Sequence, residues 1–346
     1  MKVLIVGSAE QSAGGVASVI RTMKKMPVWE ECSCYWLGTQ IQRNYLWKLW
    51  YALKAYCIAL CIIWKYDIVH FHTVPDRIGL IIQMPVLLLA IICRKKIIMH
   101  IHMGNQLRRH TDNGLFKWCL RRADIIVLLA KRWEKLFKEV FVDVNVPTTV
   151  IYNACETNAD VDFAAKEKSI IMAAYFNDNK APDILLKAWK KIKEKYLDWH
   201  VTMMGNGEVE RFRKMSEEMG LQESVTFTGY ITGKKKDDAF RKASIYCMCS
   251  YEEGFPVVVL EAWANGICVV TTPVGGLPDV IEEGKNCLTF PFGDAESLAK
   301  QLCRLIESKD LRKNIADYSH SFVCREFSIG EVSNSIKALY TRIKQE

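Results

Sequence analysis

Residues 253–261 read Glu-Gly-Phe-Pro-Val-Val-Val-Leu-Glu, and this stretch decides how the chain is interpreted. Two carboxylates eight positions apart bracket a glycine turn, a proline and an apolar run. Pro256 suits the first position of a helix, where its fixed φ helps and its missing N–H is not needed. The pattern therefore predicts a helix that starts at Pro256, with Gly254 and Phe255 in the turn before it.

The start of this helix is suited to bind a phosphate group. The first backbone N–H groups of a helix have no partner within it, and the helix dipole is positive there, so the amides of Val257 and Val258 are predicted to bind phosphate. Glu253 stands at the entrance, and Glu261 lies roughly 7.5 Å further along the axis at about 1.5 Å per residue. Carboxylates accept hydrogen bonds from sugar hydroxyls, which favours a phosphorylated sugar. An ordinary αβ unit with two solvated glutamates is the alternative.

The segment after Glu261 follows a recognisable order of elements. An apolar helix ends near Gly266, residues 267–272 have a short strand pattern, and a glycine pair stands at 275–276. This order closely resembles the C-terminal half of the retaining, nucleotide-sugar-dependent glycosyltransferases of family four, which have the GT-B fold. Glu253 and Glu261 match the E-x7-E motif of that family. The resemblance implies an α/β fold with two Rossmann-like domains that face a central cleft.

The N-terminal half fits the same resemblance. Residues 2–6 have a buried-strand pattern, and Gly14-Gly15 precede an apolar helix. In the family, this glycine pair packs its backbone against the donor pyrophosphate, where a Cβ would block close approach. Gly14 and Gly15 are therefore predicted to bind the donor, and a plain strand–helix turn is the alternative.

Three further apolar runs are predicted strands: residues 67–72, 97–104 and 123–128. The first two end in polar residues, as parallel strands do when their C-terminal ends face a cleft. His102 takes the position where the family often has a histidine that faces the donor sugar, although a structural hydrogen bond is the alternative role. His100 is expected on the opposite face of the strand or in the sheet interior.

The middle of the chain matches the family with one gap. Residues 170–174 resemble the first strand of the second domain, and Lys180 matches a lysine that binds the diphosphate. Tyr175 stands where the family usually has arginine, and Ala181 replaces a glycine. Loss of a guanidinium removes a bidentate, permanently charged phosphate ligand. Three explanations stay open: another cation substitutes, the donor differs, or catalysis is weak.

Two later strand ends also resemble parts of the donor site. Gly205 belongs to a Gly-x-Gly loop, and Gly229 with Tyr230 matches the strand end whose backbone holds the nucleobase. Each is otherwise a simple turn after a strand.

The resemblance implies a role for each matched residue. The predicted catalytic residues are Glu253, which contacts the donor sugar, His102, which orients it from the other domain, and Lys180, which neutralises the leaving diphosphate. Glu261 is predicted to hold the ribose hydroxyls. The predicted donor-binding residues are Gly14, Gly15, Gly205, Gly229, Tyr230, Gly254, Phe255, Pro256, Val257, Val258 and Glu261.

The resemblance also bears on the chemistry of transfer. No carboxylate nucleophile is assigned, because the family is usually described by front-face attack in which the donor phosphate helps to take the acceptor's proton. The GT-B resemblance implies metal independence, no metal ligand is predicted, and no cofactor is expected beyond the substrate itself, a UDP- or GDP-sugar.

Charge is distributed unevenly along the 346 residues. Residues 1–150 carry 21 Lys and Arg against 10 Asp and Glu, a net charge of +11, whereas the whole chain carries +8. A basic N-terminal half suits an anionic membrane surface or an anionic acceptor. Nucleic acid is not expected as a partner, because no helix-turn-helix, zinc-finger or RNA-recognition signature is found.

Two apolar stretches lie in this basic half. Residues 46–64 mix aromatics with lysines, as helices at a membrane interface do, and core packing is the alternative. Residues 78–93 are short of the roughly 20 needed to span a bilayer and contain Pro85, which favours a helix packed on a sheet. Acceptor recognition is expected in loops that include residues 36–45 and 103–115.

The chain is long enough for two domains. The first is expected over residues 1–155 and to bind the acceptor, and the second over 156–325 and to bind the nucleotide sugar. Residues 326–346 are expected to form a helix that crosses back to the first domain. Thirteen cysteines without a Cys-x-x-Cys pair argue for reduced, buried thiols in the cytoplasm.

These observations predict a cytoplasmic glycosyltransferase, peripheral at the inner face of the plasma membrane. It would move a hexose or related sugar, with retention, to a lipid-linked saccharide in the synthesis of capsule, O-antigen or exopolysaccharide. Two alternatives stay open: a GT-B sugar-nucleotide epimerase, and a non-catalytic sugar-nucleotide-binding partner of another transferase, which the substitution at Tyr175 favours.

Overall fold

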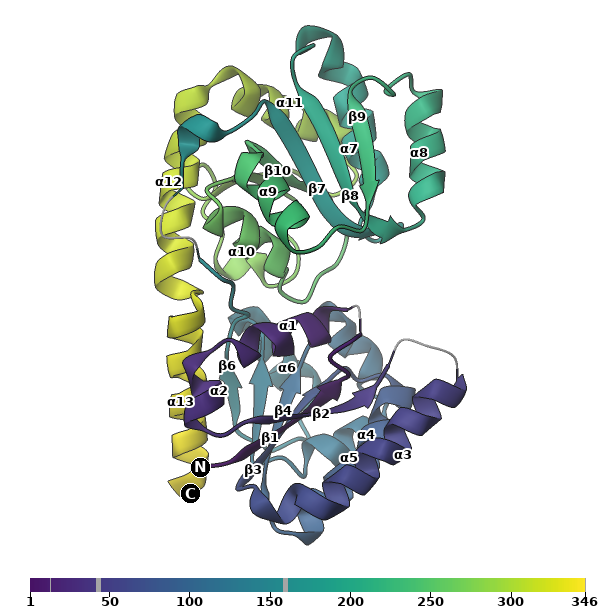
Figure 1. Cartoon of the computed structure of the whole chain (residues 1–346), viewed down its shortest axis with the longest axis vertical. Coiled ribbons are helices and arrows are strands. Elements are labelled where there is room, and N and C mark those ends of the chain that lie inside the picture. Colours follow the sequence, from purple (N-terminus) through teal and green to yellow (C-terminus); the bar gives the residue numbers. More distant parts are fainter. Residues whose placement is uncertain (13, 42–44, 158–160, 346) are drawn as a thin grey trace. The chain divides into compact units, whose positions relative to one another are not determined.

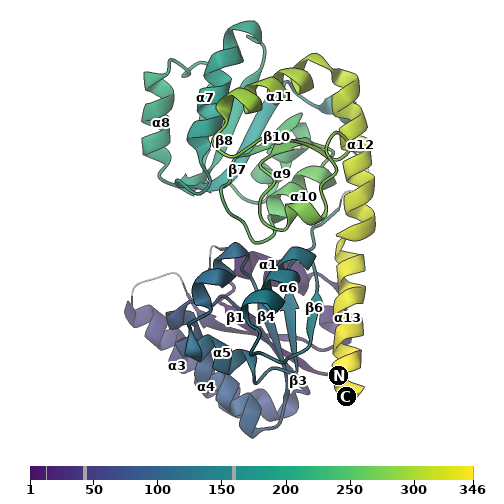
Figure 2. The same cartoon turned by 180° about the vertical axis from the view of Figure 1, so that it is seen from behind.

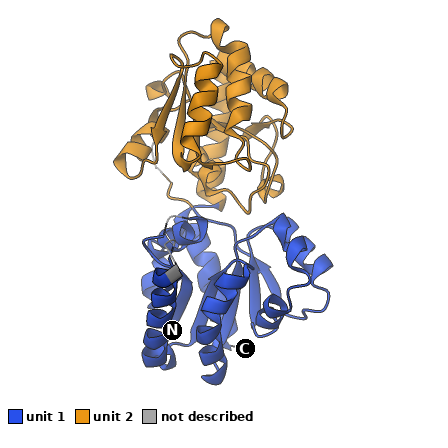
Figure 3. Cartoon of the chain, turned by 90° about the vertical axis from the view of Figure 1, so that its right-hand side faces the viewer, with its two compact units in different colours: residues 1–154, 327–346 blue, residues 155–326 orange. Residues whose placement is uncertain are grey.

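A computed structural model describes residues 1–12, 14–41, 45–157 and 161–345 of the chain (Figures 1 and 2). The chain divides into two compact units, which are coloured separately in Figure 3. Unit 1 comprises residues 1–154 and 327–346, and unit 2 comprises residues 155–326. Residues 158–160, near the start of the predicted second domain, and 42–44 of a predicted acceptor loop lie outside the described residues.

Unit 1 is built on a parallel sheet of six strands in its described part. These are β1 (Val3–Ser8), β2 (Tyr35–Gln40), β3 (Ile68–Thr73), β4 (Lys96–Ile101), β5 (Ile125–Leu128) and β6 (Thr148–Val150), in the order β2-β1-β3-β4-β5-β6. Strands β1, β3, β4 and β5 are almost wholly buried, as is typical of central strands in a parallel sheet that helices cover on both faces. The order reverses between β1 and β3, so the C-terminal ends of these two strands mark a ligand-binding position of α/β folds.

The helices of unit 1 cover both faces of this sheet (Figures 1 and 2). They are α1 (Gly15–Lys24), α2 (Pro27–Glu31), α3 (Tyr45–Ile62), α4 (Arg77–Ile92), α5 (Gly114–Leu120), α6 (Lys131–Val140) and α13 (Ile329–Gln345), with short 3-10 helices at Ile63–Lys65 and Asn105–His110. The last helix, α13, packs Ile336, Tyr340 and Ile343 into the core beside Ile5 and Ile68. Residues from both ends of the chain therefore build one core.

Unit 2 repeats this architecture. Its described strands are β7 (Ser169–Phe176), β8 (His200–Gly207), β9 (Val225–Gly229), β10 (Ile245–Met248), β11 (Cys268–Thr271) and β12 (Cys287–Thr289), in the parallel order β12-β11-β10-β7-β8-β9. The helices are α7 (Pro182–Ile192), α8 (Val209–Glu218), α9 (Lys234–Lys242), α10 (Val257–Ala264), α11 (Ala295–Glu307) and α12 (Lys309–Glu326), with 3-10 turns at Phe163–Ala165, Lys193–Lys195 and Leu277–Asp279. Here the strand order reverses between β7 and β10.

The two parallel sheets with their helices confirm the predicted α/β fold class. One predicted boundary is wrong by one residue, because Pro256 is the residue before α10 and has extended backbone angles, φ −75° and ψ 105°. The helix starts at Val257. A proline suits this position too, since its φ is fixed and the position needs no helical N–H bond.

Gly205 has a structural role that the sequence did not reveal. It pairs with Ala174 across β7 and β8, and a Cβ placed on Gly205 would lie 1.7 Å from the carbonyl oxygen of Ala174. The two strands therefore approach too closely for any side chain. This requirement explains the glycine without a ligand, and the predicted contact of Gly205 with the donor stays a prediction.

Replacement of Gly205 by alanine should lower the free energy of unfolding by about 3 kcal/mol, because neither strand can shift without disturbing the ladder. Urea denaturation followed by circular dichroism measures the change. Gly114→Ala is the matched control, since a Cβ on Gly114 at the start of α5 meets nothing within 4 Å. Equal stability of the two variants would contradict the predicted clash.

Candidate functional site

The candidate site of unit 2 lies where β7 and β10 end, at the reversal of strand order. Lys180 is in the loop between β7 and α7, and its Nζ forms an ion pair with Oε1 of Glu253. The hydroxyl of Ser250 donates to the same oxygen at 2.7 Å. The two ion-paired side chains are only 23% and 14% exposed. Both contacts use Oε1, so within the described residues Oε2 is left to accept a hydrogen bond from a ligand.

Asn179 holds the two loops of this ion pair together. Its Nδ2 donates to the carbonyl of Glu252 at 3.0 Å, and its Oδ1 accepts from the amide of Glu252 at 3.1 Å. The carbonyl of Asn179 also accepts from the amide of Tyr251 at 2.7 Å. Lys180 and Glu253 are each next to one of these bonded residues, so Asn179 fixes the distance between them.

A tight glycine turn supports Glu253 from a third segment. Gly275 has φ 67°, and a Cβ on it would lie 2.8 Å from Cβ of Glu253 and 2.9 Å from its carbonyl oxygen. The next amide, of Gly276, donates to the carbonyl of Gly254 at 2.8 Å. Only glycine tolerates both the positive φ and this close approach. The glycine pair that follows β11 therefore positions Glu253.

The start of α10 lies directly after this turn. Phe255 is buried and packs the turn against the unit, while Val257 and Val258 are half-buried. In the described residues, the amides of Val257 and Val258 donate no backbone hydrogen bond, and no side chain caps the helix. These amides are available to an anion, and the helix dipole strengthens their attraction for negative charge.

Glu261 is held by Lys236, which the sequence analysis did not identify as a site residue. Nζ of Lys236, in the first turn of α9, lies 2.8 Å from both carboxylate oxygens of Glu261. Both side chains are about one third exposed. The pair is therefore accessible to a polar ligand, and it brings a second lysine to the site.

The two departures from the family motif have different structural consequences. Ala181 has φ 45°, the left-handed conformation that glycine adopts without strain, so the backbone here has a conformation that favours glycine. Tyr175, near the end of β7, has a side chain that is 58% exposed. No guanidinium takes its place in β7, so the cations described at this site are Lys180 and Lys236.

Tyr230 and Gly229 lie at the end of β9. The side chain of Tyr230 is 61% exposed, and Gly229 has φ 70° with open space where a Cβ would project. Their predicted contact with a nucleobase stays a prediction.

Gly14, Gly15 and His102 belong to unit 1. Gly14 precedes α1, and Gly15 is its first residue, where a Cβ would meet nothing within 4 Å. Protein packing therefore gives no reason for Gly15, unlike Gly205 or Gly275. A ligand that approaches the backbone closely is a consistent explanation.

His102 is one of four histidines at the ends of β3 and β4. Its Nε2 lies 2.8 Å from Nδ1 of His72, and its ring stacks on His100 with ring centres 4.4 Å apart. Of the two positions expected for His100, the opposite face was wrong, because side chains two positions apart on a strand share a face. The sheet interior is confirmed, because His100 is buried. Burial lowers the pKa of His102 to about 3, so its ring is neutral near pH 7.

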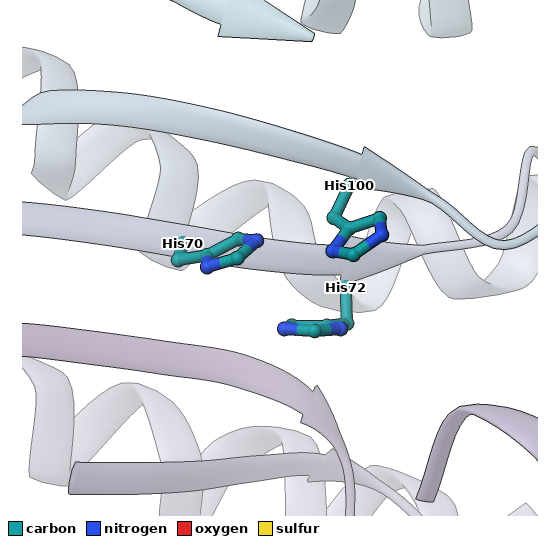
Figure 4. A group of neighbouring side chains, drawn as sticks. All are labelled: His70, His72 and His100. Carbon is teal, nitrogen blue, oxygen red and sulfur yellow. The ribbon is translucent and has the colours of Figure 1, made fainter. Parts of the chain in front are cut away.

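His70, His72 and His100 form a buried group around a common space (Figure 4). Burial, followed by the repulsion of neighbouring rings, lowers the pKa of each well below its usual range. The sequence reading found no metal-ligand cluster. The signal was nevertheless present, since a His-x-His pair ends each of two neighbouring strands.

The matching family model and two relatives that resemble this chain carry glycosyltransferase names. Residues 156–322 match the family model of the glycosyl transferases group 1. An uncharacterized glycosyltransferase of Haemophilus influenzae is 26% identical over 240 residues, which are 68% of this chain and 65% of that protein. A Campylobacter jejuni enzyme is 24% identical over 61% of this chain and 58% of its own length. Its name describes an α-1,4-N-acetyl-D-galactosaminyltransferase that acts on a saccharide linked to undecaprenol diphosphate.

The fold comparison covers nearly the whole chain. HepE of Anabaena, solved in complex with UDP-glucose, superposes with a TM-score of 0.76 at 17% identity, over 99% of this chain and 100% of that one. This likeness shows a shared fold. The aligned regions of the Haemophilus and Campylobacter relatives span less than two thirds of those proteins.

Replacement of Asn179 by alanine should lower the free energy of unfolding by about 2 kcal/mol, because it leaves the amide and carbonyl of Glu252 without these partners. Urea denaturation measures the loss. Asn145→Ala is the control, since Asn145 is exposed in unit 1 and should lose little. If the two variants were equally stable, Asn179 would not hold the loops together.

Proposed function

From the match of residues 156–322 to the glycosyl transferases group 1, we propose that this chain is a glycosyltransferase that takes its sugar from a nucleotide-diphosphate sugar. The observation that carries the proposal is the arrangement around Glu253. The segments that follow β7 and β10 carry a lysine, a carboxylate oxygen that has no partner in the described residues, and two helix amides that donate no backbone hydrogen bond there. Such a group of donors and acceptors suits a sugar joined to a diphosphate.

The diphosphate binds to Lys180 and to the amides of Val257 and Val258. Negative charge grows on the leaving diphosphate as the glycosidic bond breaks, so fixed positive groups there lower the barrier to transfer. Oε2 of Glu253 accepts a hydrogen bond from a hydroxyl of the donor sugar. The proposed reaction needs no metal ion for charge neutralisation, because the lysine and the helix terminus supply it.

The nucleoside binds beside Glu261, whose carboxylate accepts hydrogen bonds from the ribose hydroxyls. Lys236 holds that carboxylate in place at 2.8 Å. Its charge also supports the first explanation for the missing arginine, in which another cation of unit 2 compensates for Tyr175. Gly229 and Tyr230 contact the base, and Gly205 lies near the end of the neighbouring strand β8.

The family resemblance supports two further proposed roles: Gly14 and Gly15 contact the diphosphate, and His102 contacts the donor sugar. As a neutral ring, His102 acts by hydrogen bonding rather than by charge. Its Nε2 is already bonded to Nδ1 of His72, so Nδ1 of His102 is the atom left for the sugar. Transfer proceeds with retention by front-face attack, so no enzyme nucleophile is required.

The acceptor is a lipid-linked saccharide at the inner face of the plasma membrane. The Campylobacter relative supports this proposal, because its name includes a polyprenol-linked acceptor. The surface of α3 supports it too. Leu46, Leu49, Trp50, Leu53, Leu60 and Trp64 form an exposed apolar stripe at helical spacing, and residues 46–65 are long and apolar enough to cross a membrane.

Helix α4 extends this apolar surface. It packs one face into unit 1, through Leu80, Val86 and Leu87, and exposes Ile81 and Ile92 on another. On α3, Lys54 lies over the ring of Tyr51, and in the 3-10 helix that follows it, Lys65 lies over the ring of Trp64. Exposed aromatics with adjacent lysines suit the boundary between headgroups and acyl chains of anionic lipid. Synthesis of capsule, O-antigen or exopolysaccharide is the process that this proposal implies.

The alternative function is a silent sugar-nucleotide-binding subunit, which Tyr175 favours. A thermal-shift screen with UDP, GDP, ADP and their sugar conjugates, followed by assays of nucleotide release with and without acceptors, distinguishes the two. We expect one nucleotide series to raise the melting temperature, and a ligand at 100 times its Kd stabilises by about 2.7 kcal/mol. A shift without turnover would support the silent subunit. No shift would contradict donor binding.

Two variants test the assigned roles. Glu253→Gln should keep the nucleotide-induced shift but lower turnover by about 100-fold or more, because the amide cannot hold Lys180 and the sugar as the carboxylate does. Lys180→Met should weaken both binding and turnover. Glu223→Gln, on an exposed residue of the same unit, is the control. Full turnover in Glu253→Gln would exclude the proposed role of Glu253.

Membrane binding is tested by sedimentation with vesicles of phosphatidylcholine, with or without phosphatidylglycerol. The double variant Trp50→Gln, Leu53→Gln should weaken binding about tenfold or more, since each large apolar side chain contributes about 1.5–3 kcal/mol when buried. Leu197→Gln changes a leucine of unit 2 that is even more exposed than Trp50 and Leu53, and this variant should bind normally. Protein that stays in membranes after an alkaline wash would instead support a spanning α3.

A further inference from the structure

Four histidines gather on one face of the unit 1 sheet without a charged partner. His70 and His72 lie two positions apart on β3. His100 lies in β4 and His102 directly after it, and both continue the same row of side chains. The register pairs His72 directly with His100. Ring centres of neighbouring histidines lie 4.4–5.4 Å apart. Each buried ring nitrogen in such a group needs a hydrogen-bond partner or another ligand.

The outer nitrogens of two rings have partners. Nδ1 of His70 lies 2.7 Å from the hydroxyl of Tyr340 on α13, and Nδ1 of His72 lies 2.8 Å from Nε2 of His102. The inner nitrogens do not: Nε2 of His70, Nε2 of His72 and both ring nitrogens of His100 are buried without a hydrogen-bond partner in the described residues. An unsatisfied buried polar atom costs about 1–3 kcal/mol.

These unpartnered nitrogens face one another. In Figure 4, each of the three rings turns a nitrogen toward the space that the other two border, and the three potential ligand atoms lie within 4.8 Å of one another. We propose that His70, His72 and His100 bind one divalent transition-metal ion such as Zn²⁺. Nε2 of His70, Nε2 of His72 and one ring nitrogen of His100 are the ligands, and the fourth position belongs to a non-protein ligand.

The hydrogen bonds at the outer nitrogens are those that a metal site needs. Metal-binding histidines usually bond their second nitrogen to a fixed partner, which sets the tautomer and orients the ring. Tyr340 does this for His70, and His102 does it for His72. When the Nδ1 atoms of His70 and His72 carry the protons of these hydrogen bonds, the free lone pair of each ring lies on Nε2. Tyr340 was not among the predicted site residues, and His102 was predicted only to face the donor sugar.

The ligand set selects the class of metal. Imidazole nitrogens suit zinc, copper, nickel and cobalt, whereas magnesium and calcium require oxygen ligands. In the described residues the group contains histidines only, with no carboxylate. Tetrahedral zinc at about 2.1 Å from each nitrogen needs ligand atoms about 3.4 Å apart. The rings therefore move inward by up to roughly 1 Å when the ion binds, and they turn out of their nearly stacked arrangement so that their lone pairs meet the ion.

This inference is independent of the proposed sugar transfer. The ion would stabilise the ends of β3 and β4 and tie α13 to them through Tyr340. It would also fix the ring of His102 through His72, which gives the site one connection to the predicted donor-facing histidine. The role assigned to the metal is structural, and its test does not need a donor or an acceptor.

The first experiment measures binding by the full-length protein. Protein dialysed against a chelator is returned to buffer, exposed to Zn²⁺, Co²⁺ or Mg²⁺, freed of loose metal by gel filtration and analysed for metal content. We expect about one Zn²⁺ per chain, a raised melting temperature, and visible absorption bands of tetrahedral Co²⁺. Mg²⁺ should not bind. Absence of retained Zn²⁺ and of any shift would overturn the proposal and leave water as the occupant.

Two variants locate the ion. Tyr340→Phe keeps the packing but removes the hydroxyl that orients His70, and it should weaken Zn²⁺ binding about 10–100-fold. Tyr318→Phe makes the same change in unit 2, where the hydroxyl bonds Glu282, and should leave Zn²⁺ binding unchanged. Equal affinities in Tyr340→Phe and Tyr318→Phe would show that the ion does not bind at His70.

His100→Leu gives a test with opposite signs. In metal-free protein, obtained by dialysis against a chelator, the substitution removes two unpartnered nitrogens, so the melting temperature should stay the same or rise. The stabilisation by Zn²⁺ should disappear in this variant. The control is His200→Leu, which changes a partly exposed histidine of β8 and should retain the Zn²⁺ response. A Zn²⁺ shift of normal size in His100→Leu would overturn the assignment.

Discussion

Burial of the parallel strands is the constraint on which the rest of this structure depends. The central strands of both sheets are covered on both faces, so their interior positions must be apolar or fully bonded. Polar side chains are therefore concentrated at the C-terminal ends. Lys180 and Glu253 follow two such ends in unit 2. The histidines occupy two such ends in unit 1, but there the polar groups begin inside the strands, where solvent cannot satisfy them.

The sequence predicted what local pattern controls. The apolar runs located the strands, and the order of helix, glycine and strand after Glu261 indicated the architecture. The helix at residues 257–264 was predicted to start one residue early, because proline suits both the first helical position and the one before it. The predicted roles of the site residues were drawn from resemblance, and they remain predictions about chemistry.

Contacts between distant segments could not be predicted in this way. Lys236 and Glu261 are 25 positions apart, and no short motif joins them. Asn179 bonds Glu252 across 73 positions. The histidine group depends on the register of β3 against β4, and the error over His100 came from a wrong assignment of alternation. The apolar stretch at residues 46–64 was visible, but its exposure depends on what the rest of unit 1 covers.

The return of α13 to unit 1 has a consequence for the order in which the protein folds. A ribosome delivers residues 1–154 first, yet Ile336, Tyr340 and Ile343 belong to the same core as β1 and β3. Unit 2 has all its residues before α13 is synthesised, so it can complete its core during translation. Unit 1, although made first, must wait with part of its apolar surface exposed until the last helix emerges. Unit 1 is therefore expected to complete its core after unit 2, although most of its residues are synthesised first.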